Sequence, residues 1–290
     1  MVEEYIFPKS VEEALELLER YGGEARIIAG GTDLVLQLRR GEVRARVLVD
    51  ITRIPEIRGI KEEDGFIWVG ATTTHQEVAE SPLIQAKASL LAKACRSIGS
   101  LQIRNVGTIG GNLVNAMPAA DSAIALAALD AEVEVASKDG SRWIPITQFH
   151  VDVGECCINP CLELVKGVRF RPLGKNEGSS FQRLARRQAL ILPILNVGVV
   201  VGWEEGQFSR AAIAIGPVAP IPFRAQKAEE YLKGSPVSAE SIEEAARLAQ
   251  EEAQPRSSLL RGSAEYRKDM VRVLVRRALM EAAQIPGHSI

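Results

Sequence analysis

Apolar residues in the first fifty positions alternate between helical spacing and short continuous runs. Ser10 can cap a helix whose apolar stripe follows it and which Gly22-Gly23 ends. Short apolar runs over residues 25–29 and 47–51 predict buried strands, and the segment 33–40 between them predicts a short helix. The expected order is therefore helix, strand, turn, helix and strand.

The middle of the chain mixes hairpin patterns with apolar helices. Strand-like runs flank Asp64-Gly65 and Asp139-Gly140, which predicts two β-hairpins. Thr74 and Glu77 have the spacing of a helix start. The other elements expected here are one long helix over 82–98, a buried helix over 118–129 and a strand over 162–170.

The composition changes at residues 171–178, where polar residues, Gly and Pro indicate a linker or surface loop. Beyond this segment, apolar runs predict strands and helical periodicity predicts helices. The strands are expected within 189–203 and 211–215, although residues 189–195 could instead begin as a helical turn. The helices are expected over 225–232, 239–253 and 263–283. Strands followed by helices indicate a compact α+β domain.

The charge balance excludes several classes of protein. The 290 residues include 35 basic and 37 acidic side chains, a formal net charge of −2, and the pI is about 6.1. A nucleic-acid-binding domain is expected to cluster basic residues and to have a high pI. No apolar run approaches the ~18 residues that span a bilayer, and the acidic N-terminus is unlike a secretory signal. We therefore expect a cytoplasmic protein of two domains.

Three of the four cysteines lie close together in the sequence, at Cys156, Cys157 and Cys161, whereas Cys95 is distant. A closed zinc or iron–sulfur site needs four ligands, and His150 is the only other Cys or His nearby. We expect free thiols in a reducing compartment rather than a metal site.

Two glycine pairs stand where a strand is expected to give way to a helix. They are Gly30-Gly31, which Thr32 and Asp33 follow, and Gly110-Gly111, which Asn112 follows. Glycine lets the backbone approach a ligand closely, and unpaired N–H groups at a helix start favour an anion. Two such turns in one domain predict a ligand with a phosphate bridge, held from both sides.

Groups for acid, base or nucleophilic catalysis are scarce. His75, His150 and His288 lack the neighbours of a catalytic triad, so we expect surface or hydrogen-bonded histidines. Asp121, which follows the second glycine pair, can either stabilise a helix start or accept the hydroxyl groups of a ribose or ribityl chain. A phosphate cradle without catalytic residues indicates that a bound cofactor performs the chemistry.

Several segments, in a fixed order, carry a family resemblance. They are Ala29-Gly30-Gly31-Thr32-Asp33-Leu34, Gly70-Ala71-Thr72-Thr73, residues 98–105, Thr108-Ile109-Gly110-Gly111-Asn112, Pro118-Ala119-Ala120-Asp121 and residues 181–187. Together they resemble the FAD-binding subunit of the molybdenum hydroxylases, the family of xanthine dehydrogenase, bacterial carbon monoxide dehydrogenase and aldehyde oxidoreductase. The resemblance extends over nearly the whole chain.

The resemblance implies an α+β fold with two domains. Residues 1–175 would form a two-lobed FAD-binding domain of the PCMH/vanillyl-alcohol-oxidase-like type, with lobes of about 1–55 and 56–175. Residues 176–290 would form a small sheet followed by three helices. FAD would lie between the two lobes of the first domain.

The resemblance also implies a set of cofactor-binding residues. The segment 29–34 would wrap the pyrophosphate from one side and the segment 108–112 from the other. Asp121 would bind ribityl or ribose hydroxyls, Ile98 would lie beside the isoalloxazine ring and Leu164 near the adenine half. The full set is Ala29, Gly30, Gly31, Thr32, Asp33, Leu34, Thr72, Ile98, Thr108, Gly110, Gly111, Asn112, Asp121, Leu164 and Arg183.

The implied partners are a large molybdopterin subunit and a small subunit with two [2Fe–2S] clusters, arranged as a dimer of heterotrimers. Electrons would pass from molybdenum through the clusters to FAD, and then to NAD or another acceptor. The substrate would be oxidised on a partner chain, so neither catalytic residues nor metal ligands are expected here.

The sequence departs from its relatives near Gln182 and Arg183, a segment in which many of them carry a lysine that can reach the cofactor. It also lacks the four-cysteine insertion that holds a [4Fe–4S] cluster in some relatives. One alternative is a stand-alone FAD-dependent reductase or oxidase of the same superfamily, which needs an acid or base over the flavin. Another is a nucleotide-binding scaffold without redox activity.

Overall fold

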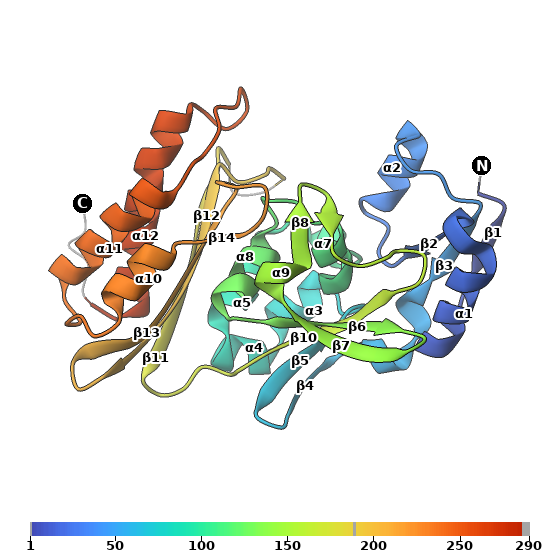
Figure 1. Cartoon of the computed structure of the whole chain (residues 1–290), viewed down its shortest axis with the longest axis horizontal. Helices are drawn as coiled ribbons and strands as arrows, with labels where there is room; N and C mark the ends of the chain where they lie inside the picture. Colours follow the sequence, from blue (N-terminus) through green and yellow to red (C-terminus); the bar gives the residue numbers. More distant parts are fainter. Residues whose placement is uncertain (1, 188–189, 286–290) are drawn as a thin grey trace. The chain divides into compact units, whose positions relative to one another are not determined.

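The computed structural model describes residues 2–187 and 190–285 and divides into two compact units (Figure 1). The first unit contains the chain up to residue 78 together with 100–116 and 131–171. The second contains 79–99, 117–130 and the chain from 172 onward. Two segments from the first half of the chain therefore belong to the same unit as its C-terminal part.

A three-stranded parallel sheet opens the first unit. β3 (Val47–Asp50) lies in the centre, between β1 (Glu4–Ile6) and β2 (Ala25–Ile28). α1 (Val11–Tyr21) packs its apolar stripe into the core of this sheet, and α2 (Leu34–Arg40) follows β2. These elements confirm the predicted order, except that β1 was missed because three residues are too few to show a strand period.

The second sheet of this unit is antiparallel and has five strands. Its order is β4 (Ile60–Glu63), β5 (Phe66–Gly70), β10 (Leu164–Phe170), β6 (Glu132–Ser137) and β7 (Gly140–Pro145). Both predicted hairpins are present. Asp64 and Gly65 have φ angles of 52° and 77°, the left-handed values that a tight two-residue hairpin turn requires.

Shorter elements connect these sheets. They are η1 (Gly22–Glu24), η2 (Ile51–Arg53), η3 (Pro55–Ile57), α3 (His75–Glu80), α6 (Leu101–Arg104), α7 (Ile109–Val114), α9 (Ile146–Phe149), β8 (His150–Asp152) and β9 (Glu155–Cys156). The Thr74 and Glu77 signal is confirmed at the start of α3, where the Glu77 carboxylate accepts the Thr74 N–H at 2.8 Å. α7 carries the second glycine pair.

The second unit is built on a four-stranded antiparallel sheet with helices on both faces (Figure 1). The strands are β11 (Glu177–Leu184), β12 (Leu195–Glu204), β13 (Gln207–Gly216) and β14 (Phe223–Arg224). One face carries α10 (Gln226–Leu232), α11 (Ala239–Glu252) and α12 (Ala264–Ala282). The other carries α5 (Ser89–Ser97) and α8 (Asp121–Ala128), with α4 (Pro82–Lys87) beside α5.

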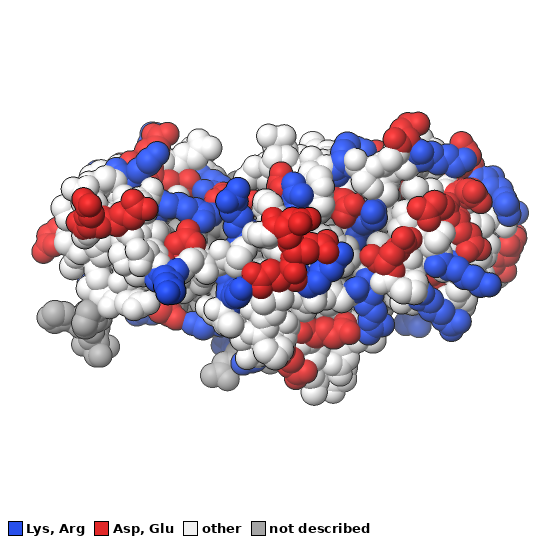
Figure 2. All heavy atoms as spheres, turned by 90° about the horizontal axis from the view of Figure 1, so that it is seen from below, with Lys and Arg blue, Asp and Glu red and all other residues white. Residues whose placement is uncertain are grey.

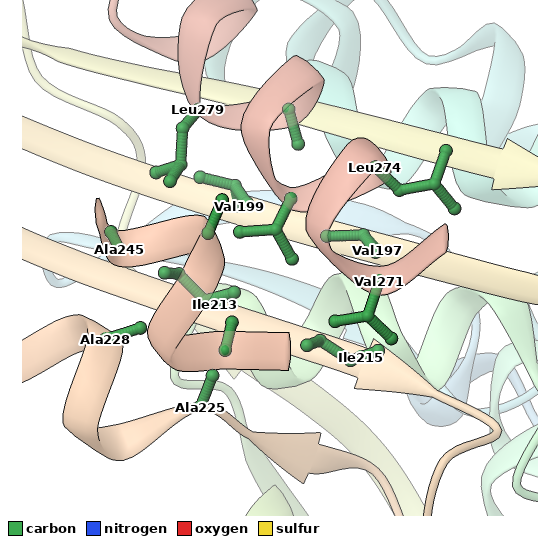
Figure 3. Close-up of a cluster of buried hydrophobic side chains, with 14 of the residues drawn as sticks. Val197, Val199, Ile213, Ile215, Ala225, Ala228, Ala245, Val271, Leu274 and Leu279 are labelled. Carbon is green, nitrogen blue, oxygen red and sulfur yellow. The ribbon is translucent and has the colours of Figure 1, made fainter. Parts of the chain in front are cut away.

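Alternation along β12 explains why both faces are covered. Val197 and Val199 point into the core beneath the three C-terminal helices, where they meet Val271 and Leu279 of α12 (Figure 3). Gly198 faces the opposite way, and a Cβ placed there would lie 3.1 Å from the Ile124 carbonyl of α8. The α+β class is confirmed, with a small sheet and three helices at the C-terminal end.

Two predicted helices and the first C-terminal strand need correction. The single helix over 82–98 is wrong, because Ala88 leaves the helical conformation with φ −156° and separates α4 from α5. The preceding carbonyl, that of Lys87, accepts the Leu173 N–H at 2.9 Å. The helix expected from 118 begins only at Asp121, and the strand expected from 189 begins only at Leu195; Ala189 itself lies outside the described residues.

Within the described ranges, no helix is both long and apolar enough to cross a membrane. On the face of the molecule that Figure 2 shows, basic and acidic side chains are interspersed. This distribution agrees with the nearly balanced charge of the sequence.

Candidate cofactor site

The first glycine turn joins β2 to α2 and leaves a run of backbone donors exposed to a ligand. Gly31 has a φ of 67°, a conformation that favours glycine. Among the described residues, no acceptor is present for the backbone N–H groups of residues 30–34. Asp33 precedes α2 without a side-chain capping bond, so it does not consume these donors. Five consecutive free N–H groups form a site suited to an anion.

The second glycine turn differs from this expectation. The Ile109 N–H donates to the Thr73 carbonyl at 3.0 Å, and the Gly110 N–H donates to the Ala71 carbonyl at 2.9 Å. The Gly111 N–H donates to the hydroxyl of the cap residue Thr108 at 3.1 Å. The prediction that unpaired N–H groups follow both glycine pairs is therefore wrong for the second, because neighbouring backbone and the cap already accept them.

The chain folds so that the two turns lie against each other in the first unit. A Cβ added to Gly30 would lie 1.9 Å from the Val106 carbonyl oxygen and 3.0 Å from the Cα of Gly107. A Cβ added to Gly110 would lie 2.6 Å from the Cβ of Ala71. Gly30 and Gly110 are thus required for close backbone packing, which brings the free donors of the first turn beside the second.

His75 contacts the second glycine turn through both its backbone and its ring. Its backbone N–H donates to the Gly107 carbonyl at 2.9 Å, and its ring lies 3.5 Å from the position of a Gly107 Cβ. The ring is buried, and its Nδ1 has no hydrogen-bond partner among the residues that the structure describes. Burial, with a smaller contribution from Arg104, lowers the pKa of His75 to about 4. The expectation of a surface or hydrogen-bonded ring is wrong for His75. Its backbone N–H, and not its ring, makes the hydrogen bond to the second turn.

The other two histidines differ in what the structure shows. His150 begins β8, is buried, and its Nε2 lies 2.9 Å from the Leu113 carbonyl, which confirms a hydrogen-bonded histidine. His288 lies outside the described residues.

Two further predicted residues of the first unit have their side chains engaged. The Thr72 hydroxyl donates to the Ile57 carbonyl at 2.9 Å and is buried. Leu164 begins β10 and packs in the core that also contains Leu18 of α1. The first unit therefore brings together the two glycine turns and Thr72, and it holds Leu164 by its side chain in the core.

The second unit contains the remaining predicted residues, Ile98, Asp121 and Arg183. Asp121 opens α8 and is 5% exposed, and its Oδ2 accepts the Arg183 Nε at 3.2 Å. Burial raises the pKa of Asp121, whereas Arg183 and the hydrogen bonds to Asn196 and Ser97 oppose that shift. Ile98 is the residue directly after α5.

Asn196 contacts the predicted site residue Asp121 and was missed from the sequence. Its Nδ2 donates to Asp121 Oδ1 at 2.6 Å, and it is completely buried in β12. A polar residue inside an otherwise apolar strand was the available signal, since a buried amide needs partners. Only the fold shows that its partner is Asp121.

The three neighbouring cysteines carry free thiols. Cys156 lies in β9, and its Sγ is 3.7 Å from the Val114 carbonyl at the end of α7. Burial raises the pKa of Cys156 and of Cys157. In the described part of the chain, no group of three or more potential ligands is arranged to hold a metal ion.

Comparison with known proteins identifies both halves of the chain. Residues 1–171 match the family described as the FAD binding domain in molybdopterin dehydrogenase, and residues 179–282 match the CO dehydrogenase flavoprotein C-terminal domain. The xanthine dehydrogenase FAD-binding subunit of Escherichia coli O157:H7 is 33% identical over 266 residues, 91% of this chain and 90% of that protein. The carbon monoxide dehydrogenase medium chain of Hydrogenophaga pseudoflava is 32% identical over 279 residues, 96% of each chain.

The solved structures agree with the sequence relatives. A chain of carbon monoxide dehydrogenase from Hydrogenophaga pseudoflava superposes with a TM-score of 0.92 at 33% identity, covering 97% of both chains. A chain of quinoline 2-oxidoreductase from Pseudomonas putida 86 superposes with a TM-score of 0.89 at 27% identity, covering 98% of this chain and 97% of that one. The chain belongs to the FAD-binding subunits of the xanthine and carbon monoxide dehydrogenase type of molybdenum hydroxylase.

Proposed function

We propose that this chain is the electron relay of a molybdenum hydroxylase complex. Electrons released by substrate oxidation on a partner chain would reach FAD from [2Fe–2S] clusters and leave to NAD or another acceptor. Membership of the FAD-binding family and the absence of an evident acid, base or nucleophile in the sequence support this role. FAD supplies the redox chemistry, and the chain supplies binding and orientation.

The observation that carries the proposal is the pair of abutting glycine turns. The free N–H groups of residues 30–34 can bind the pyrophosphate without displacing an internal acceptor. Gly30 permits close packing against Val106. The second turn is held by its internal hydrogen bonds and therefore fixes the position of the first turn. The residues present therefore fit the cofactor that the family name specifies.

The individual contacts to FAD follow the family resemblance. Residues 29–34 would hold the pyrophosphate, and residues 108–112 would support that turn from its other side, with Thr72 nearby. Ile98 would lie beside the isoalloxazine ring, and Leu164 near the adenine half. Asp121 would bind ribityl or ribose hydroxyls, and Arg183 would be the basic group that reaches the cofactor where many relatives carry a lysine.

The proposed domain boundary is residue 175. The family matches over 1–171 and 179–282 support a boundary of this kind in sequence. The two compact units divide the chain differently, because residues 79–99 and 117–130 pack with the C-terminal part. Residues 1–175 would thus supply FAD contacts, and some of their helices would also complete the C-terminal unit.

The proposed partners are a large molybdopterin subunit and a small [2Fe–2S] subunit, in a cytoplasmic dimer of heterotrimers. The names of two relatives support this assembly: one is the medium chain of a carbon monoxide dehydrogenase, and another is subunit alpha of the 6-hydroxypseudooxynicotine dehydrogenase complex of Paenarthrobacter nicotinovorans. The latter is 36% identical over 279 residues, 96% of this chain and 94% of that protein.

The test is to purify the full chain and measure bound flavin. We expect one FAD per chain, and loss of FAD in Gly30→Val, whose side chain would enter the space of the Val106 carbonyl. Gly23→Val is the matched control, because a Cβ at Gly23 meets nothing within 4 Å. A chain that takes up no FAD would overturn the proposal, and steady turnover of a small substrate by the isolated chain would favour the stand-alone flavoenzyme instead.

A further inference from the structure

We propose that Asp121 is a positioning residue that acts through Arg183 to fix the backbone around Ile98. This inference rests on the proposed FAD-binding function, and it gives Asp121 and Arg183 one joint role rather than two separate contacts with the cofactor. All residues of the argument lie in the second unit.

The carboxylate of Asp121 is the centre of a buried network from four elements. Arg183 of β11 reaches Oδ2 at 3.2 Å, and Asn196 of β12 reaches Oδ1 at 2.6 Å. The Ser97 hydroxyl at the end of α5 donates to the Ala94 carbonyl at 2.7 Å and acts on Asp121 by lowering its pKa. A carboxylate accepts about four hydrogen bonds, so Arg183 and Asn196 occupy about half of its capacity.

Arg183 carries the network onward to the segment before β12. Its side chain is 11% exposed, and its Nη2 donates to the Ile191 carbonyl at 2.5 Å. The neighbouring Leu190 N–H donates to the Gly99 carbonyl at 3.2 Å. The guanidinium therefore holds the carboxylate on one side and the backbone at Ile191 on the other.

These contacts reach the backbone next to Ile98. The carbonyl of Gly99, directly after Ile98, accepts the Leu190 N–H, and Ser97, directly before Ile98, acts on the pKa of Asp121. From Asp121 to Leu190, the connection runs through Arg183 and the Ile191 carbonyl. Since Ile98 is the residue proposed to lie beside the isoalloxazine ring, the ion pair sets the surface that the flavin meets.

Asn196 makes this arrangement rigid. It donates to Asp121 at 2.6 Å and, more weakly, to the Ala119 carbonyl at 3.4 Å, which ties β12 to the start of α8. Its Oδ1 is buried without a partner in the described ranges, and a Cβ on Gly216 would come within 2.7 Å of that oxygen. The tight surroundings leave the amide little freedom to turn away from the carboxylate.

The experiment compares Asp121→Asn, Arg183→Met and the double variant in the FAD-loaded chain. Readouts are the flavin absorption spectrum, flavin fluorescence and reduction potential, with bound FAD measured separately. We expect both single variants to shift the flavin spectrum and potential in the same direction, and the double variant to match the larger single shift. Arg183→Lys, which keeps the charge, should restore part of the wild-type spectrum.

Asp130→Asn is the matched control, because Asp130 is an ion-paired carboxylate that follows the opposite end of α8. It should leave the flavin unchanged. Shifts that add in the double variant, or no shift in either single variant, would overturn the joint role. If Asp121→Asn does not fold, Arg183→Met decides: a flavin shift that is smaller in Arg183→Lys supports the proposal, and an unshifted flavin in Arg183→Met overturns it.

Wild-type protein separates this proposal from the function on which it rests. A wild-type chain without FAD contradicts the FAD-binding role itself. A wild-type chain that binds FAD, with variants whose flavin is unchanged, contradicts only the positioning role of Asp121.

Discussion

The two glycine turns share a sequence pattern but differ in what their backbones do. In the described part of the chain, the turn at Gly30-Gly31 has five consecutive N–H groups without an internal acceptor, whereas the N–H groups at Gly110-Gly111 donate to Thr73, Ala71 and Thr108. The first turn therefore keeps its backbone donors available for an anion, whereas the second turn uses its own donors inside the protein and packs against the first. A glycine pair after a strand predicts close backbone approach, but the neighbouring strands decide whether a ligand or the protein itself uses it.

The free energy of unfolding should depend on pH, because the neutral His75 ring is buried against the second glycine turn. Its pKa is lowered from 6.5 to about 4, so the unfolded chain binds a proton before the folded chain does. Stability is fully present above pH 6.5 and is lost as the pH falls toward about 4. The loss should reach about 3 kcal/mol in the free energy of unfolding. Urea unfolding between pH 7 and pH 4 measures it.

His75→Asn tests whether this residue causes the slope. The variant should flatten the fall between pH 6.5 and pH 4 relative to wild type, since Asn does not titrate. His150 contributes in the same direction, because burial lowers its pKa as well, so part of the slope should remain. Identical slopes in the variant and wild type would contradict the assignment to His75.

Close packing of the second turn should make Gly110 intolerant of a side chain. Gly110→Ala places a Cβ 2.6 Å from Ala71 Cβ and 2.9 Å from its carbonyl oxygen. Overpacking of this kind costs about 1–3 kcal/mol, which urea unfolding of the apoprotein would detect. Gly111→Ala is the control within the same pair, since its Cβ meets only the Thr108 hydroxyl, at 3.0 Å. Equal losses for both variants would show that packing on Ala71 is not the cause.

Removing the residue before each helix should give a smaller difference in the free energy of unfolding between the two turns. Thr108→Ala removes the acceptor of the Gly111 N–H and should lower the free energy of unfolding by about 1 kcal/mol. Asp33→Ala, at the equivalent place before α2, removes no capping bond and should change it by less than about 0.5 kcal/mol. A larger loss for Asp33→Ala than for Thr108→Ala would contradict the inference that the second turn, and not the first, uses a side-chain cap.

Local signals in the sequence predicted much of the fold. Ser10 and the Asp64-Gly65 turn act through their immediate neighbours, so the helix and hairpin that they specify were foreseeable. The break at Ala88 was not, because the carbonyl before it bonds to Leu173, far along the chain. Helical periodicity continues across the break and carries no sign of that contact.

The site was predictable in position but not in its bonding. The glycine pairs and Asp121 were found from residue type and order, since these are local features. The partners of Asp121 come from α5, β11 and β12, and only tertiary packing unites them. For the same reason, the acceptors of the Ile109 and Gly110 N–H groups could not be inferred, because Thr73 and Ala71 precede them by more than thirty residues.

The placement of α8 has a consequence for biosynthesis. All eight of its residues are buried, and β12 and β13, which cover it, are encoded much later in the chain. While the ribosome makes the intervening segments, this apolar helix has no sheet to pack against, so it is an exposed target for chaperones. A stop codon near the proposed domain boundary at residue 175 would therefore release not a finished flavin domain but a polypeptide prone to aggregation.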